Sequence, residues 1–169
     1  YDIINANIGF DTYDFGDVVD GYIGIHYHQL DEGISLDLDG ALNSGFVDKG
    51  INGTDTFVQV ENPLFYNGPK GGVGLIGTHY DDDFSIKTVA GQWLQVRAGD
   101  GVDSFSISGD GTVRLDMSNG HQGVEVNLAT QINENDGYGN TETFTGHFSE
   151  VRSTHNDDKI VGSTLDERF

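Results

Sequence analysis

The stretch Ala98-Gly-Asp-Gly-Val-Asp-Ser-Phe-Ser106 decides the fold, because it joins a glycine-rich turn to a short alternating strand. Glycine allows positive φ and a close approach between backbones, and aspartate is common in the same turns. The last residues place a large apolar side chain between two polar ones, which is typical of a half-buried strand. We write this unit as nine positions, with Gly at 1, 2 and 4, Asp at 6 and a large apolar residue at 8. The stretch matches positions 2, 4, 6 and 8.

The same unit recurs with variation in four other places. Ala6–Asp14 keeps positions 4, 6 and 8, Gly77–Ser85 keeps 1, 6 and 8, and Ser153–Val161 keeps 6 and 8. Gly162–Phe169 follows without a gap, with Glu167 in place of the aspartate. Because the sequence stops inside this last unit, we expect the natural polypeptide to continue.

Alternation of apolar and polar residues also dominates the rest of the chain. No window of 11 or more residues shows the sustained i, i+3, i+4, i+7 spacing of an amphipathic helix. Short alternating strings, bounded by Gly, Asn and Asp, predict half-buried strands and therefore an all-β fold. These strings are Ile23–Tyr27, Ile34–Leu38, Phe57–Val60, Trp93–Val96, Phe105–Ile107 and Val124–Leu128.

The chain also resembles itself over a long period, which indicates a duplication. Four segments recur in the same order, at offsets that fall from 92 to 76 residues. The largest deletion in the second copy falls at 62–72, so we expect that stretch to be an excursion from the scaffold. We predict two related units, residues 1–90 and 91–169, packed as one continuous body. The matched segments are Gly9–Phe15 with Gly101–Ile107, Gly33–Leu38 with Gly123–Leu128, Thr54–Phe57 with Thr141–Phe144, and Thr78–Phe84 with Thr154–Ile160.

If successive units stack in parallel, their strands lie about 4.8 Å apart. The carboxylates at position 6 then form columns. Two such charges roughly 5 Å apart repel by roughly 3 kcal/mol at an effective dielectric constant of about 20. Several pairs would rival the whole stability of a small domain, about 5–15 kcal/mol. A hard divalent cation with oxygen ligands removes this repulsion, so folding and cation binding should be coupled by mass action.

Composition narrows the classes of partner. The chain has 169 residues and a formal net charge of −20, which argues against a nucleic-acid-binding groove and favours cationic partners. There is no cysteine, so disulfides and thiolate metal sites are excluded. No apolar run approaches the 18 or more residues of a membrane span, and we expect none.

The units resemble the glycine-rich nonapeptide repeats of RTX proteins, the haemolysin-type calcium-binding family. The closest likeness is the succession Gly123–Thr130, Thr141–Phe144 and Val151–Gly162. The resemblance implies a right-handed parallel β-solenoid, similar to a β-roll but with irregular loop insertions. It further implies a secreted, extracellular module of a larger RTX polypeptide, exported by a type I system, with Ca²⁺ bound. Because no catalytic signature is recognisable, we expect no enzymatic activity.

The resemblance also implies which residues bind calcium. The position-6 ligands are Asp11, Asp82, Asp103 and Asp158. Backbone carbonyls of Gly99 and Gly101 are the best candidates to complete the shell, and the neighbouring Asp81, Asp100 and Asp157 are further candidates.

Histidines offer a different kind of metal site. His26 and His28 have strand spacing that places both imidazoles on one face, and Asp31 is a nearby carboxylate. They have no histidine counterpart in the second unit, and no third ligand stands out, so paired surface histidines are the favoured interpretation. His79 and His155 occupy the same position of the same unit, which favours a scaffold role.

Two alternative functions remain open. β-Helical polysaccharide lyases and epimerases use Tyr, His, Arg or Lys with calcium, but no catalytic signature is recognisable here. The residues of that type considered are Tyr27, Tyr66, Tyr80, Arg97 and Arg114. A module that binds an extracellular glycan is the other alternative, with Phe65 and Tyr66 as aromatic platforms.

Overall fold

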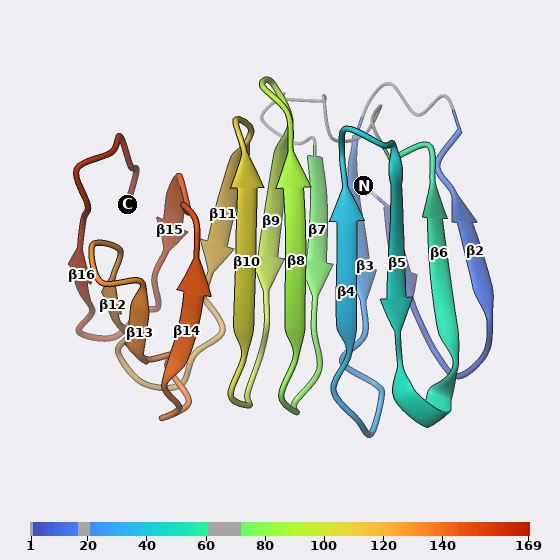
Figure 1. Cartoon of the computed structure of the whole chain (residues 1–169). Helices are drawn as coiled ribbons and strands as arrows, with labels where there is room; N and C mark the ends of the chain where they lie inside the picture. Colours follow the sequence, from blue (N-terminus) through green and yellow to red (C-terminus); the bar gives the residue numbers. More distant parts are fainter. Residues whose placement is uncertain (1, 17–20, 61–71) are drawn as a thin grey trace.

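The computed structural model describes residues 2–16, 21–60 and 72–169 (Figure 1). Strands and turns make up almost all of this part of the chain, which confirms the predicted all-β class. The one helical element in it is the 3₁₀ turn η1 (Gly50–Asn52). Among the described residues, no helix has the length and apolar character needed to cross a membrane.

The strands form two sheets. The first, sheet A, has six strands, and each pairs in parallel with its neighbours. In spatial order they are β1 (Asp2–Asn5), β3 (Tyr22–His26), β7 (Gly72–Ile76), β9 (Trp93–Arg97), β11 (Thr112–Asp116) and β15 (Glu150–Arg152).

The second, sheet B, has ten strands and is mixed. In spatial order they are β16 (Lys159–Val161), β12 (Glu125–Asn127), β13 (Ile132–Asn135), β14 (Glu142–Thr145), β10 (Ser104–Gly109), β8 (Asp83–Thr88), β4 (Ser35–Asp39), β5 (Ser44–Asp48), β6 (Thr54–Val58) and β2 (Asp11–Asp14).

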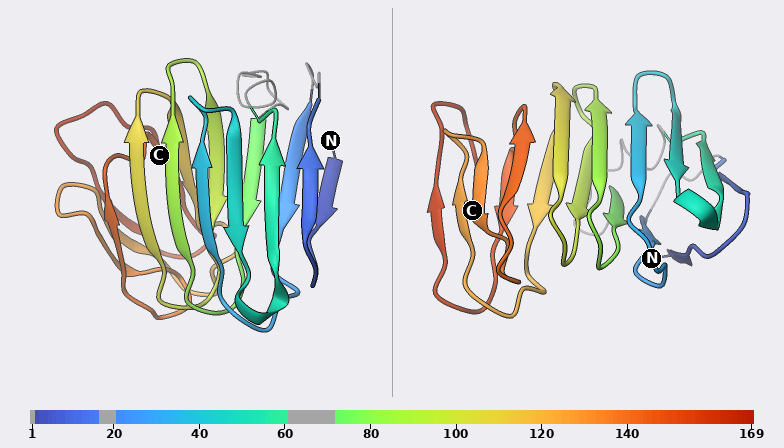
Figure 2. Two further views of the ribbon diagram at one scale, coloured as in Figure 1. Left: turned by 45° about the vertical axis from the view of Figure 1, so that its right-hand side comes forward. Right: turned by 60° about the horizontal axis from the view of Figure 1, so that its bottom comes forward.

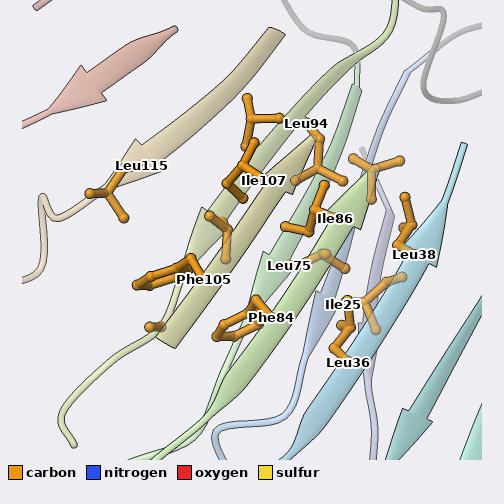
Figure 3. Close-up of a cluster of buried hydrophobic side chains, with 14 of the residues drawn as sticks. Ile25, Leu36, Leu38, Leu75, Phe84, Ile86, Leu94, Phe105, Ile107 and Leu115 are labelled. Atoms are coloured by element: carbon orange, nitrogen blue, oxygen red, sulfur yellow. The ribbon is translucent and has the colours of Figure 1, made fainter. Parts of the chain in front are cut away.

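The chain passes back and forth between the sheets, which lie face to face (Figures 1 and 2). Alternate residues of each strand point inward, as in Phe84 and Ile86 of β8, both almost fully buried. Figure 3 shows these side chains meeting others from both sheets, such as Leu75 of sheet A and Leu36 of sheet B. Phe84 also stacks on Phe105 of the next strand, with ring centroids 5.4 Å apart.

Strand order repeats after eight strands. Sheet A reads β1-β3-β7 and then β9-β11-β15, while sheet B reads β2-β6-β5-β4-β8 and then β10-β14-β13-β12-β16. Every strand of the first series therefore has a counterpart eight strands later. The four pairs of similar segments in the sequence fall on such counterparts: β2 with β10, β4 with β12, β6 with β14 and β8 with β16. The two series meet at β7 beside β9 and at β8 beside β10.

The expectation of parallel strands with loop insertions needs correction in sheet B. The insertions include two strands, β5 and β13, which run antiparallel to both of their neighbours. Each forms one hairpin with the strand before it and another with the strand after it. Three consecutive strands of the chain, β4–β5–β6 and β12–β13–β14, therefore lie side by side. The expected excursion at 62–72 lies outside the described residues, apart from Gly72, which begins β7.

Candidate functional site

A column of buried acidic residues lies inside sheet B, at the turns that lead into its strands. Asp82 precedes β8, Asp103 precedes β10, and Glu142 begins β14. Because Asp83 pairs with Ser104, which pairs with Thr143, the three acids stand on neighbouring strands at one level. Their exposed fractions are 3, 1 and 2 %. Parallel register therefore brings together carboxyl groups that lie far apart in the sequence.

Asp82 is held by hydrogen bonds on both oxygens. Its Oδ1 accepts from the Ile34 N–H at 2.8 Å and from the Thr78 hydroxyl at 2.9 Å, and its Oδ2 accepts from the Thr78 N–H at 2.7 Å. Burial raises the pKa of Asp82 to about 6, in spite of these hydrogen bonds, which favour the ionised form. Asp82 thus links the turn before β8, through hydrogen bonds, to Ile34, the residue before β4.

Asp158 repeats this arrangement at the turn before β16. It accepts from the Val124 N–H at 2.9 Å and from the Thr154 hydroxyl at 2.7 Å. Desolvation opposes ionisation here, but the hydrogen bonds outweigh it and hold the pKa of Asp158 below its usual value. A Thr-x-x-x-Asp motif recurs in both units, and its threonines were not singled out from the sequence as functional residues.

In the first unit a buried lysine pairs with the buried Asp55 and lies near Asp11, whose side chain is 42 % exposed. Lys49 is 0 % exposed, and its Nζ lies 2.5 Å from Asp55 Oδ1 and 2.6 Å from the carbonyl oxygen of Asn7. The same Nζ lies 3.9 Å from Asp11 Oδ2. The Tyr27 hydroxyl donates to Asp55 Oδ2 at 3.1 Å. Lys49 was not identified from the sequence, because nothing local marks it as a buried residue.

The second unit holds the corresponding acids without a lysine. Asp103 and Glu142 are the counterparts of Asp11 and Asp55, and the buried polar group that contacts Glu142 is the amide of Asn133. Asp103 Oδ1 accepts from the Asp82 N–H at 2.8 Å, whereas its Oδ2 has no hydrogen-bond donor among the described residues. Burial, together with the charge of Glu142, raises the pKa of Asp103, and burial also raises the pKa of Glu142. Burial and mutual repulsion thus favour the protonated form of these two carboxyl groups.

A small cavity adjoins Glu142, and Arg97 also lines it. It has a volume of about 20 Å³, which is room for about one water molecule, and Gly99, Asp136 and Glu142 contribute to its wall. Asp136 Oδ1 accepts from the N–H groups of Tyr138, Gly139 and Asn140 at 2.8–2.9 Å. The cavity thus places a space of about one water molecule beside two acidic residues, Asp136 and Glu142.

The glycines expected to coordinate calcium have a packing role. Gly99 and Gly101 have φ of 127° and 123°, a region that side chains rarely adopt. A Cβ on Gly99 would collide with the carbonyl oxygen of Thr78, and one on Gly101 with that of Tyr80. Both glycines therefore let the turn before β10 lie directly on the turn before β8.

The remaining expected ligands lie on the surface of the turns. Asp81 Oδ1 accepts from the Val102 N–H at 2.8 Å, and Asp100 Oδ1 accepts from the Gly101 N–H at 3.0 Å. Asp157 is exposed. In the part of the chain that is described, no three His, Cys, Asp or Glu side chains stand in an arrangement that could hold a metal ion. The acids brought together are thus the buried Asp82, Asp103 and Glu142.

The histidines lie apart from this column. His26 and His28 share one face, with ring centroids 5.7 Å apart. Burial lowers the pKa of His26, and His28 and Arg97 lower it further. Asp31 accepts a hydrogen bond from Asn52 Nδ2 at 3.1 Å. His79 and His155 are exposed at corresponding turns, next to the threonines that make the turn hydrogen bonds.

The residues considered for polysaccharide chemistry do not converge on one site. Tyr27 is in the core, where burial and then the charge of Asp55 raise its pKa. Arg97 and Arg114 are on sheet A and are ion-paired with Asp116 and Glu150, each at 2.6 Å. Tyr80 lies on an exposed turn. Phe65 and Tyr66, which were also the glycan candidates, lie outside the described residues.

No family model, no curated protein and no solved structure matches this chain.

Proposed function

We propose that this chain is a calcium-stabilised structural module of a larger secreted protein of RTX type. In this proposal the two sheets form a right-handed parallel β-solenoid, and folding is coupled to calcium binding. The alternation of the chain between two sheets supports the solenoid, since each passage adds one strand to each sheet over long stretches. The nine-residue turn units support the relation to RTX proteins.

The observation that carries the calcium proposal is the difference between the two units. Lys49 supplies a positive charge to Asp55 in the first unit, whereas Asn133 contacts Glu142 in the second. Asp103 Oδ2 is buried and has no donor. Buried carboxylates without a compensating charge cost several kcal/mol each, on the order of 3–5 kcal/mol.

Calcium would be held by the two acids of the second unit. Carboxylate oxygens are the ligands that Ca²⁺ prefers, and Asp103 Oδ2 and the Glu142 carboxyl are the oxygens that fit this role. The bound ion supplies the positive charge that Lys49 supplies in the first unit. Asp82 and Asp158 contribute differently, because their oxygens already hold backbone N–H groups and fix the turns.

Coupling to calcium suits an extracellular module. Extracellular calcium-binding modules have dissociation constants of about 10⁻⁴–10⁻³ M. A chain with a net charge of −20 and two uncompensated buried acids would remain loosely folded in a calcium-poor cytoplasm. It would become ordered after export, when calcium replaces the shared proton.

Thermal unfolding tests this proposal. At pH 7.5, after chelation, calcium at 100 times its dissociation constant should stabilise the chain by about 2.7 kcal/mol. For a chain of this size that is a rise in Tm of roughly 5–10 °C. Glu142→Gln should raise the Tm in chelator and lose most of the calcium-dependent rise.

A carboxylate on the neighbouring strand provides the matched control. Glu134 is exposed on β13, so Glu134→Gln should respond to calcium as the unchanged chain does. No calcium-dependent rise in the unchanged chain would refute the calcium proposal. A rise of the same size in Glu142→Gln would refute the assignment to this acid pair.

A further inference from the structure

In the chain of residues 1–169 taken by itself, the outermost strands at both ends of the stack have no neighbouring strand on one side among the described residues, apart from a single bridge from Arg168 to β15. One end consists of β1 and β2, and the other of β15 and β16 (Figure 1). We propose that the β15/β16 end of one chain binds the β1/β2 end of a second copy, and so reproduces the junction already present in the middle of the molecule. This inference does not depend on calcium binding.

The eight-strand repeat provides the argument. In the middle of the molecule, β7 binds β9 and β8 binds β10. Strands β15 and β16 are the counterparts of β7 and β8, while β1 and β2 are the counterparts of β9 and β10. The two ends therefore carry the two halves of an interface that the chain forms once internally.

The internal junction shows what holds such an interface. Strands β8 and β10 pair over six positions, from Asp83 with Ser104 to Thr88 with Gly109. In the preceding turns, the Asp82 N–H donates to Asp103 Oδ1, and the Val102 N–H donates to Asp81 Oδ1, both at 2.8 Å. The junction is thus held together by three kinds of contact: backbone pairing, stacking of the Phe84 ring on Phe105, and these two turn hydrogen bonds.

The β1/β2 end retains the groups that make one half of this junction. Asp11 and Tyr13 occupy the positions of Asp103 and Phe105. The adjacent turn exposes large apolar side chains: Phe10 is 83 % exposed and Ile8 71 %. Exposed apolar residues beside an open strand edge are typical of an interaction surface.

The β15/β16 end retains the other half. Asp157, Asp158 and Ile160 occupy the positions of Asp81, Asp82 and Phe84. In the register of the internal junction, the Asp158 N–H of one copy donates to Asp11 of the next. Phe169 is 62 % exposed and Leu165 57 %, so apolar surface lies at this end too.

The segment after β16 shows that β15 accepts a further strand. Arg168 forms a parallel bridge with Glu150, with hydrogen bonds from the Val151 N–H to Arg168 O at 2.9 Å and from the Arg168 N–H to Ser149 O at 3.0 Å. Gln95 pairs in the same way with Gly74 at the internal junction. Arg168 makes one bridge, whereas β7 pairs with β9 over four positions at the internal junction, so the proposed pairing of β15 with β1 of a second copy would displace Arg168 in favour of a longer ladder.

An interface between unlike ends does not close on itself, so it generates open chains of copies rather than dimers. The net charge of −20 on each copy opposes stacking. Salt screens that repulsion, with a Debye length of about 3 Å at 1 M. Association should therefore increase with both protein concentration and ionic strength.

Sedimentation velocity over a hundredfold range of concentration, in 0.5 M NaCl, tests the proposal. The Asp11 and Phe15 N–H groups face β6, so the alternation along the strand directs the Thr12 N–H to the open edge. Thr12→Pro removes that donor without removing an internal hydrogen bond. It should raise the concentration needed for association at least tenfold, while Thr12→Ala should not. Arg168→Pro weakens the competing bridge and should lower that concentration.

Circular dichroism confirms that each variant is folded, and Phe10→Lys, on an exposed turn, provides a second way to block the same end. Species that grow beyond dimers and are suppressed by Thr12→Pro or Phe10→Lys support the inference. It is overturned if the unchanged chain and Arg168→Pro both stay monomeric, if assembly stops at dimers, or if neither blocking variant weakens association.

Discussion

Lys49 Nζ lies 2.5 Å from Asp55 Oδ1, and neither side chain has any exposure to solvent. In the second unit the Asn133 amide donates to Glu142, the counterpart of Asp55. The two units therefore differ in the group that contacts the buried acid, which is a charged lysine in the first and a neutral amide in the second. The first carries its own cation, whereas for the second we propose a proton or an ion from solution.

Replacing the buried lysine should be strongly destabilising. Lys49→Met leaves Asp55 buried without a compensating charge, which should lower the free energy of unfolding at pH 7 by about 3–5 kcal/mol. Urea unfolding measures this loss. Lys87→Met breaks an exposed ion pair with Asp39 and should cost about 1 kcal/mol or less. Equal losses in the two variants would show that burial of the Lys49 pair has no special consequence.

Stability in chelator should fall as the pH rises. The pKa values of Asp82, Asp103 and Glu142 are raised on folding, so the folded state binds more protons than the unfolded chain at intermediate pH. The stability that these groups contribute is complete below about pH 4 and is lost as the pH rises through their folded pKa values, about 6 for Asp82.

Other carboxyl groups cause the stability to fall again at the acidic end of the pH range. The pKa of Asp116 is lowered because the hydrogen bonds from Ser118 and the charge of Arg97 outweigh desolvation. The pKa of Asp158 is also lowered on folding. The stability that Asp116 and Asp158 contribute is therefore lost as the pH falls below about 4. Thermal unfolding from pH 3 to 9 should show a maximum near pH 4–5. A maximum above pH 7 in chelator would contradict the proposed protonation of the acid pair.

The two turn threonines should differ in importance. Thr78 is 1 % exposed and its hydroxyl donates to the buried Asp82, so Thr78→Val should cost about 1.5–3 kcal/mol, the range for hydrogen bonds to charged groups. Thr154→Val removes the same bond to the more accessible Asp158 and should cost less. Chemical denaturation compares them. A larger loss for Thr154→Val would show that burial does not decide the strength of this contact.

Gly99→Ala should weaken the junction between the two units. The added Cβ meets the Thr78 carbonyl at a positive φ, so strain of about 1–3 kcal/mol is expected. Gly16 provides the comparison, since it has φ of 51° and no atom of the described residues comes within 4 Å of an added Cβ. Gly16→Ala should cost about 1 kcal/mol. Thermal unfolding of both variants measures the difference, and equal effects would show that the close approach of the turns is unimportant.

The sequence by itself determined that the fold is all-β, that the chain contains a duplication, and that its acidic residues lie at the turns that precede strands. Alternation in Ile34–Leu38 and Phe105–Ile107 is local, and so is the glycine requirement of the turn at Gly99 and Gly101. These features depend on residues close together in the chain, where the period of a strand and the conformation of a turn can be recognised.

Only the tertiary structure decided which acids have a compensating charge. Asp103 meets Glu142 because β10 and β14 pair in parallel register, and Lys49 meets Asp11 and Asp55 because antiparallel β5 brings the start of η1 back to β6. Lys49 and Asp55 are only six residues apart, but Asp11 and Lys49, like Asp103 and Glu142, are far apart in the sequence, and the strand register that brings them together is set by the packing of the whole core. Because electrostatic energy depends on distance and burial, the difference between the two units becomes visible only when the strands are assembled.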